Sequence, residues 1–212
     1  MARPKLQINR KTDILDAAQV LFTQKGFEKT TIQEIADYIG IGKGSVYLDF
    51  KNKDEIYVGL IERYALSSFE EAKELVKTSD KSYIELFEII TMNHIAEVFD
   101  RSTSHVHTYV ALMHTSYHIK QRLKPIIQNW FTLMSLVLEK AAKAGDIKEY
   151  RNYNELVELM NTSFLGFYPP YDMKYSPELR TDLSKQEIRT LLLKDVSIIM
   201  KILLSGLKNV NY

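Results

Sequence analysis

Hydrophobic residues along most of this chain recur three and four positions apart, the spacing that places them on one face of an α-helix. One stripe near the start consists of Ile14, Leu15, Ala18, Leu21 and Phe22. A second stripe, about two turns long, consists of Ile32, Ile35, Ala36 and Ile39. The pattern predicts short, closely spaced helices at the N-terminus and a longer helix that leaves them near residue 53.

Polar residues and a glycine mark where these short helices begin and end. Thr31 and Glu34 have the spacing of a capping box, in which each side chain accepts a hydrogen bond from the other residue's backbone N–H. Asn52 and Glu55 repeat that spacing before the longer helix. Gly40 ends the second helix, because only glycine enters the left-handed conformation at a helix end without steric cost.

Residues 42–47 restart the chain as another short helix, with Lys43, Gly44 and Ser45 at its beginning. Two short helices around a turn containing glycine, with small and basic residues opening the second, describe a helix-turn-helix, the unit that places a recognition helix in the DNA major groove. Two short amphipathic helices around a glycine also occur in ordinary helical cores. The pattern alone therefore leaves both interpretations open.

The remainder of the chain has helical periodicity interrupted by turn signals. We expect helices near 53–77, 81–100, 104–118, 120–144, 152–167 and 185–208, with Pro125 marking a kink or a late start in the fourth of these. The predicted fold is all-α with about nine helices. We expect two domains: a helix-turn-helix domain with a basic N-terminal arm over residues 1–53, and a helical bundle over residues 54–212.

Residues 14–61 closely resemble the N-terminal domain of the tetracycline-repressor (TetR) family. The matching elements are Ala17-Ala18 with Leu21-Phe22, Gly26-Phe27, Thr30-Thr31, Ile35-Ala36, Gly40, Lys43-Gly44-Ser45-Val46-Tyr47, Phe50 and Lys51-Asn52-Lys53. The resemblance implies a dimeric DNA-binding regulator whose middle helices hold an inducer and whose two C-terminal helices pair with a second copy. It implies that the domain over residues 1–53 binds DNA and that the bundle over residues 54–212 is a regulatory domain for ligand binding and dimerisation.

The resemblance and the chemistry of the side chains together predict the residues that contact DNA. Lys43 can reach a phosphate or a guanine edge, and Ser45 and Tyr47 supply hydroxyl groups. Gly44 lets the backbone approach the duplex closely. The predicted DNA-binding residues are Thr31, Lys43, Gly44, Ser45, Tyr47 and Lys53. Val46, by contrast, is expected to be core.

Two places depart from the family pattern. Gly42 stands where Ser or Thr is common, so a helix cap and a phosphate contact are absent. Leu48 and Asp49 stand where an aromatic residue or histidine pair is common. Beside a phosphate backbone the Asp49 carboxylate would be repulsive, so it points away, accepts a hydrogen bond from a cytosine amino group, or lowers non-specific affinity. We expect it to point away.

The charge distribution agrees with a division into two parts. The net charge is only +1, but residues 1–53 hold nine Lys or Arg and six Asp or Glu, whereas residues 54–212 hold nineteen and twenty-one. A basic head on a weakly acidic body is typical of a DNA-binding protein. The positive charge of the first eleven residues, however, is also explained by an ordinary solvated terminus. The absence of cysteine fits a reducing cytosol, and no run of 18 apolar residues exists to span a membrane. We expect a cytoplasmic protein.

Aromatic and methionine residues concentrate between positions 92 and 171, where the resemblance implies an effector pocket. The predicted ligand-binding residues are Phe99, Tyr109, Met113, Tyr117, Trp130, Met134, Phe164 and Tyr168. Such residues can line a largely apolar pocket, but they suit an ordinary core as well. All five histidines lie between positions 94 and 118, and His114 and His118 have the spacing to share a metal. Without cysteine or an adjoining carboxylate motif, we expect no metal and no cofactor.

The final helix is apolar on more than one side, which exceeds what a helix facing a single core requires. We therefore expect the last two helices to form a homodimer interface, because two-fold operators are read by two-fold dimers. The sequence predicts a repressor that binds a palindromic operator in double-stranded DNA and is released by a small, largely apolar effector. The alternatives are a helical interaction module without sequence-specific DNA binding and a helical-bundle enzyme. The absence of a nucleophile–base pair or cofactor fingerprint disfavours the enzyme.

Overall fold

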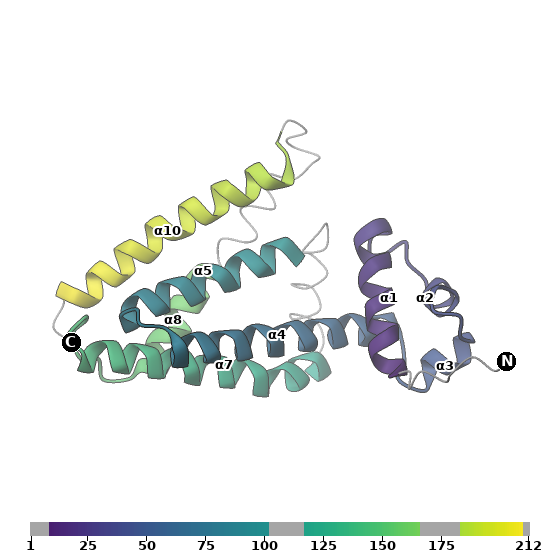
Figure 1. The fold of residues 1–212 in the computed structure, drawn as a ribbon, viewed down its shortest axis with the longest axis horizontal. Coiled ribbons are helices and arrows are strands. Elements are labelled where there is room, and N and C mark those ends of the chain that lie inside the picture. Colours follow the sequence, from purple (N-terminus) through teal and green to yellow (C-terminus); the bar gives the residue numbers. More distant parts are fainter. Residues whose placement is uncertain (1–8, 102–116, 166–182, 210–212) are drawn as a thin grey trace. The chain divides into compact units, whose positions relative to one another are not determined.

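The computed structural model describes residues 9–101, 117–165 and 183–209, and within these ranges the chain forms eight helices and no strand (Figure 1). The helices are α1 (Arg10–Lys25), α2 (Ile32–Tyr38), α3 (Lys43–Tyr47), α4 (Lys53–Thr78), α5 (Tyr83–Arg101), α7 (Tyr117–Lys143), α8 (Tyr153–Leu165) and α10 (Lys185–Asn209). The all-α prediction is confirmed. Most of the helix predicted over 104–118 lies outside the described residues, as do residues 166 and 167.

Most predicted helix bounds agree with the observed ones to within about three residues, the usual uncertainty of helix ends. The sequence offered two roles for Pro125, a kink or a late start of its helix. Pro125 lies inside α7, which begins at Tyr117, so the late start was wrong and the kink stays a prediction. None of the described helices combines the length and the hydrophobicity that crossing a lipid bilayer requires.

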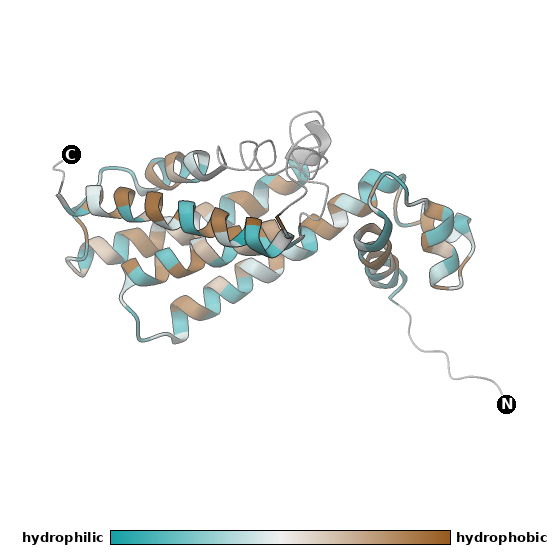
Figure 2. Cartoon of the chain, turned by 90° about the horizontal axis from the view of Figure 1, so that it is seen from above, coloured by the Kyte–Doolittle hydropathy of each residue, from teal (hydrophilic) through white to brown (hydrophobic). Residues whose placement is uncertain are grey.

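The described residues divide into two compact units. The head includes the described residues up to Leu66 and residues 117–119. It contains α1, α2, α3, the first part of α4 and the beginning of α7. The body begins at Ser67 and contains the rest of α4, α5, α8, α10 and α7 from Lys120 onward. In both units, hydrophobic and hydrophilic segments alternate along each helix, as expected of amphipathic helices packed around a core (Figure 2).

The head has its own hydrophobic core. Ile14 from α1, Ile35 and Ala36 from α2, and Val46 from α3 are completely buried. This burial confirms the hydrophobic stripe predicted for residues 32–39 and the predicted core position of Val46. Three aromatic rings extend the core, since the ring centroid of Phe27 lies 5.2 Å from that of Phe22 and 5.2 Å from that of Tyr57. Such tilted pairs add to the energy of area burial.

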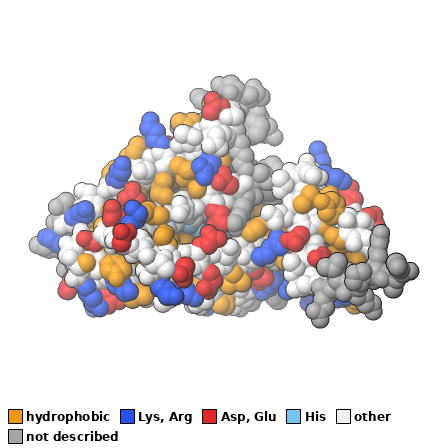
Figure 3. Space-filling model, viewed as in Figure 1, with side chains coloured by type: hydrophobic (Ala, Val, Ile, Leu, Met, Phe, Trp, Pro, Cys, Tyr) orange, Lys and Arg blue, Asp and Glu red, His pale blue; other side chains and the backbone are white. Residues whose placement is uncertain are grey.

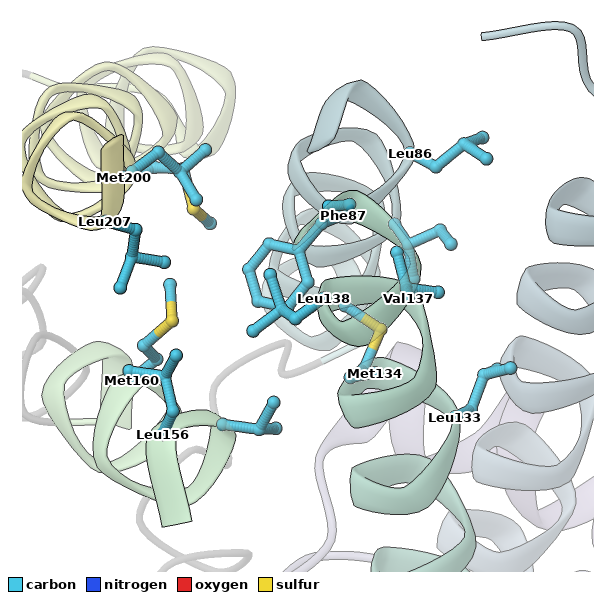
Figure 4. Packing of buried hydrophobic residues seen from close by; sticks show 14 of the residues in the cluster. Leu86, Phe87, Leu133, Met134, Val137, Leu138, Leu156, Met160, Met200 and Leu207 are labelled. Carbon is cyan, nitrogen blue, oxygen red and sulfur yellow. The ribbon is translucent and has the colours of Figure 1, made fainter. Parts of the chain in front are cut away.

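The body core is formed by residues from α4, α5, α7, α8 and α10. Figure 4 shows Phe87 of α5, Leu138 of α7, Met160 of α8 and Met200 of α10 gathered in one region. Each of these side chains is at most 3% exposed. An ion pair between Arg189 and Asp100, with Nε and Oδ1 2.7 Å apart, joins α10 to α5 at the edge of this core.

Serine–glutamate pairs begin two of the body helices. The backbone N–H of Ser82 donates to Glu85 at 3.0 Å and the N–H of Glu85 donates to Ser82 Oγ at 3.3 Å, so this pair closes a capping box at the start of α5. Ser184 and Glu187 form the same reciprocal pair at the start of α10. Each pair satisfies N–H groups that have no acceptor inside the helix.

Candidate nucleic-acid interface

The turn between α2 and α3 is set by local hydrogen bonds. Gly40 has a positive φ of 72°. Its N–H donates to the carbonyl of Asp37 at 3.2 Å, and the N–H of Ile41 donates to the carbonyl of Ala36 at 3.0 Å. These two bonds form the Schellman motif, which ends a helix at a left-handed glycine. Gly40 therefore stops α2 as predicted, and α3 begins after a short turn.

The start of α2 also follows the prediction. The N–H of Glu34 donates to Thr31 Oγ1 at 3.2 Å, and the N–H of Thr31 donates to Glu34 Oε2 at 2.9 Å, which confirms the capping box. Lys25 of α1 adds a hydrogen bond to Glu34 Oε1 at 2.5 Å. Lys25, followed by the bonds from Thr31, lowers the pKa of Glu34 from 4.5 to about 2. Glu34 therefore holds the first two helices together as well as capping one of them.

Helix α3 presents most of the predicted DNA-binding residues at the surface. Lys43, Gly44 and Tyr47 are exposed, and Ser45 is half-buried. The ammonium of Lys43 lies 5.9 Å from the centroid of the Tyr47 ring, one turn along the helix. A Cβ atom added to Gly44 would meet no other atom within 4 Å. The structure therefore brings four of the six predicted residues together on one short helix.

The other two predicted residues have partners within the head. The hydroxyl group of the exposed Thr31 is hydrogen-bonded to Glu34 in the capping box. The ammonium of Lys53 donates to the backbone carbonyls of Phe27 at 2.6 Å and Glu28 at 3.2 Å, and it lies 4.3 Å from the centroid of the Phe27 ring. Lys53 thus fastens the segment between α1 and α2 to the start of α4. Sequence reasoning missed this contact because the partners lie 26 and 25 positions away.

The two departures from the family pattern have local explanations. Gly42 makes no side-chain cap, as predicted, although its carbonyl accepts the N–H of Ser45 at 2.8 Å. Asp49 accepts a hydrogen bond from Arg10, with Nε and Oδ2 2.5 Å apart. This bond, more than the attraction of Arg10 and Lys11 at longer range, lowers the pKa of the Asp49 carboxyl from its usual range. The partner of Asp49 was not foreseen from the sequence.

A small hollow lies in the body among α4, α5 and α7. Its volume is about 60 Å³, and its lining includes Ser68, Glu71, His94, Glu97 and Trp130. The rings of His94 and Trp130 lie 4.4 Å apart between centroids, and Ser68 donates a hydrogen bond to Glu97. The hollow is therefore partly polar.

The predicted ligand-binding residues are divided by the structure. Trp130 lines the hollow, whereas Met134 is buried in the body core and Phe99 packs against that core. The residues Tyr109, Met113 and Tyr168 and the side chains of Tyr117 and Phe164 lie outside the described part of the chain. The polar lining of Glu71, His94 and Glu97 was missed, because in the sequence these residues look like ordinary surface positions of two separate helices. No group of three metal-binding side chains occurs among the described residues.

Comparison with known proteins agrees with this geometry. A sequence profile described as "Bacterial regulatory proteins, tetR family" matches residues 14–60. The chain is 24% identical over 136 residues to the fatty acid metabolism regulator protein of Bacillus subtilis (strain 168), which covers 64% of this chain and 70% of that protein. It is 32% identical over 100 residues to the transcriptional repressor KstR2 of Rhodococcus jostii (strain RHA1), covering 47% and 48%. Residues 14–60 therefore match the N-terminal domain of the TetR family.

The TetR-family fold extends beyond the matched head. The crystal structure of the regulator FadR from Bacillus subtilis, in complex with stearoyl-CoA, superposes with a TM-score of 0.66 at 19% identity, over 92% of this chain and 98% of that one. SmeT, the repressor of a Stenotrophomonas maltophilia multidrug efflux pump, superposes with a TM-score of 0.62 at 22% identity, over 94% and 90%. Identities this low show the fold alone. The chain spans about half the length of KstR2.

Proposed function

We propose that this TetR-family protein is a repressor that binds a palindromic operator as a homodimer and leaves it when a small effector occupies the body. The proposed DNA contacts are Lys43, Gly44, Ser45 and Tyr47, with Thr31 and Lys53 at the neighbouring helix ends. Binding to chromosomal DNA would place the protein in the cytoplasm. The observation that carries the DNA-binding part is the open space around Gly44.

Neither packing within the chain nor backbone conformation requires a glycine at position 44. A Cβ atom would meet nothing within 4 Å, and Gly44 lies in a helix without a positive φ. Alanine would favour the helix by up to about 1 kcal/mol, so glycine here reduces stability without relieving a clash. A surface that approaches the backbone of α3 closely, as the edge of a DNA groove does, accounts for the missing side chain.

The test combines a selection from random duplexes with the substitution Gly44→Ala. Wild-type protein should select a palindromic sequence, with an affinity that falls steeply as salt rises. G44A should be at least as stable as wild type to thermal unfolding and yet bind the selected operator at least tenfold more weakly. The matched control is Thr23→Ala, which also improves helix propensity at an exposed position of the head. Equal operator binding by G44A and T23A would contradict the proposal.

The proposal of a homodimer rests on two helix faces that differ in charge. The outer face of α8 carries the exposed residues Glu155, Glu158, Leu159 and Thr162. The outer face of α10 carries the exposed residues Lys194, Ile198, Lys201, Ile202 and Ser205. Figure 3, in the same view as Figure 1, shows basic side chains at intervals along the upper left surface, where α10 lies. Two copies related by a two-fold axis can pair the acidic face of one with the basic face of the other.

Each of these faces also carries exposed apolar side chains, which a dimer contact would bury. Leu159 is 57% exposed and Ile202 is 65% exposed, although both are large hydrophobic residues. Ile202→Glu should convert the dimer to a folded monomer in sedimentation experiments, because it places a charge in an apolar contact. Leu136→Glu is the matched control, since Leu136 is also exposed but lies on α7. A dimeric I202E protein would argue against this interface.

The proposed effector binds beside Trp130 in the body. The FadR relative was crystallised with stearoyl-CoA, so long-chain acyl-CoA is the first class of ligand to test. The hollow is small, about 60 Å³, so an acyl chain could enter only if the body repacks. Repacking would provide the difference in affinity between two states on which release from DNA depends.

Trp130 is the single tryptophan of the sequence, so its fluorescence reports on this part of the body without labelling. Titration with stearoyl-CoA should change that fluorescence and release the protein from its operator over the same concentration range, whereas coenzyme A alone should do neither. Fluorescence and operator binding that are both unaffected by acyl-CoA would exclude this ligand class.

A further inference from the structure

The first residue of α1 is tied to the segment that follows the recognition helix. Arg10 Nε and Asp49 Oδ2 are 2.5 Å apart, although the two residues are 39 positions apart in the chain. The N–H of Asp49 donates to the carbonyl of Val46 at 3.0 Å, so the backbone that carries the carboxylate is fixed by the end of α3. The next residues also meet, because the ammonium of Lys11 lies 5.7 Å from the centroid of the Phe50 ring.

The Arg10–Asp49 bond uses one particular part of the guanidinium group. Nε is the donor, and within the described part of the chain the two terminal NH₂ groups of Arg10 make no hydrogen bond to protein. The Arg10 side chain is 40% exposed and that of Asp49 is 20% exposed. A guanidinium held through Nε keeps four N–H donors in a fixed plane, and this planar fork suits the oxygens of a phosphate group.

We propose that Asp49 is a positioning residue for DNA binding: it holds Arg10 so that the terminal NH₂ groups meet a backbone phosphate beside the recognition helix. This inference rests on the proposed DNA-binding function. Arg10 is the residue that touches the phosphate, and Asp49 acts through it. The carboxylate that looks unfavourable beside DNA is thereby paired, and its role is to orient a cation.

The direction in which one substitution changes operator affinity separates this role from simple charge repulsion. Asp49→Asn removes a negative charge from the head, so repulsion alone predicts tighter binding to every duplex. Positioning predicts the reverse. Arg10 in D49N must lose side-chain freedom when it meets the phosphate, so operator binding should weaken by about three- to tenfold. Arg10→Lys, which keeps the charge but has no Nε–H or fork, should weaken binding to a similar degree.

A double-mutant cycle completes the test. Arg10→Ala should weaken operator binding. It should also reduce the steepness of the plot of log affinity against log salt concentration by about 1, the amount expected for the loss of one phosphate contact. In the R10A protein, adding Asp49→Asn should no longer weaken binding, because the carboxylate has nothing left to orient. Asp49→Glu, which retains a carboxylate, should recover part of the affinity lost in D49N.

The matched control is Asp16→Asn. Asp16 also pairs with an arginine of the head, since its Oδ1 lies 2.5 Å from Nη1 of Arg63. D16N removes the same charge from the same unit but frees a different arginine, so operator affinity should change less than twofold. Thermal unfolding of each variant establishes that the head is folded.

The outcomes distinguish the two proposals. Wild-type protein that selects no duplex would remove the DNA-binding function itself. Wild-type protein that selects an operator, with D49N binding it as tightly as wild type or more tightly, would overturn the role of Asp49 while leaving the function intact. Weakening of D49N that persists unchanged in the R10A background would also overturn it.

Discussion

The ammonium of Lys53 and the Phe27 residue are joined twice, by a hydrogen bond of 2.6 Å to the backbone carbonyl and by the approach of the charge to 4.3 Å from the ring centroid. Phe27 in turn packs against the rings of Phe22 and Tyr57. The start of α4 is therefore attached to the aromatic part of the head core, and Lys53 has a structural role apart from any contact with DNA.

Replacing this ammonium should destabilise the head. Lys53→Met should lower the free energy of unfolding by about 1–2 kcal/mol, because a charged hydrogen bond to a backbone carbonyl is lost and the carbonyl is left without that donor. Chemical denaturation followed by circular dichroism measures the change. Lys51→Met is the control, since Lys51 is exposed, and it should stay within about 0.5 kcal/mol of wild type. Equal losses for the two variants would contradict the role of Lys53.

The turn of the helix-turn-helix depends on one glycine and tolerates change at another. Gly40→Ala should destabilise the head by about 1–2 kcal/mol, because alanine is strained at a φ of +72°. Gly42→Ser should stabilise the head by about 0.5–1 kcal/mol. Gly42 has an extended backbone and lacks only a capping side chain, which serine supplies. Thermal unfolding should show a lower Tm for Gly40→Ala and a higher Tm for Gly42→Ser than for wild type. Shifts of Tm in the same direction would contradict these roles of the two glycines.

A third glycine is required by packing. A Cβ atom on Gly59 of α4 would lie 3.0 Å from Leu15 Cδ2 and 3.1 Å from Phe50 Cε1. Both neighbours are buried, so they have little room to move, and Gly59→Ala should destabilise the head by about 1 kcal/mol or more.

Gly206→Ala in α10 provides the comparison, since a Cβ atom there meets nothing within 4 Å. In that helix alanine should stabilise by up to about 1 kcal/mol. Denaturation midpoints of the two variants should therefore move in opposite directions, and stabilisation by Gly59→Ala would show that the core gives way more easily than proposed.

Stability of the head should fall in acid through Glu34. The folded-state pKa of this carboxyl is about 2, below its ordinary 4.5, so its contribution is present above pH 4.5 and is lost as the pH falls toward 2. Lys25→Met removes the largest cause of the lowered pKa and should therefore reduce the loss of thermal stability between pH 4.5 and 2. It leaves the capping box of Thr31 and Glu34 in place. An acid profile identical to that of wild type would disprove this role of the Lys25–Glu34 pair.

Local patterns predicted much of the fold. The stripes of hydrophobic residues, the Thr31–Glu34 capping box and the stop at Gly40 each involve residues within a few positions of one another. Interactions of this range are set by the 3.6-residue period of the helix and by backbone sterics, so they can be read from sequence order. The burial of Val46 and the exposure of Lys43 and Tyr47 follow from the same periodicity.

The partners of charged residues at the site depended on the tertiary structure. The sequence by itself determined that this is a helical protein with a TetR-like head and a recognition helix opened by Lys43. Only the folded chain decided that Lys53 binds the carbonyl of Phe27, 26 positions away, and that Asp49 pairs with Arg10, 39 positions away. Long side chains at a surface can meet any element that folds against them, and no local period encodes which one. Packing therefore decided which charges of the head remain available to DNA.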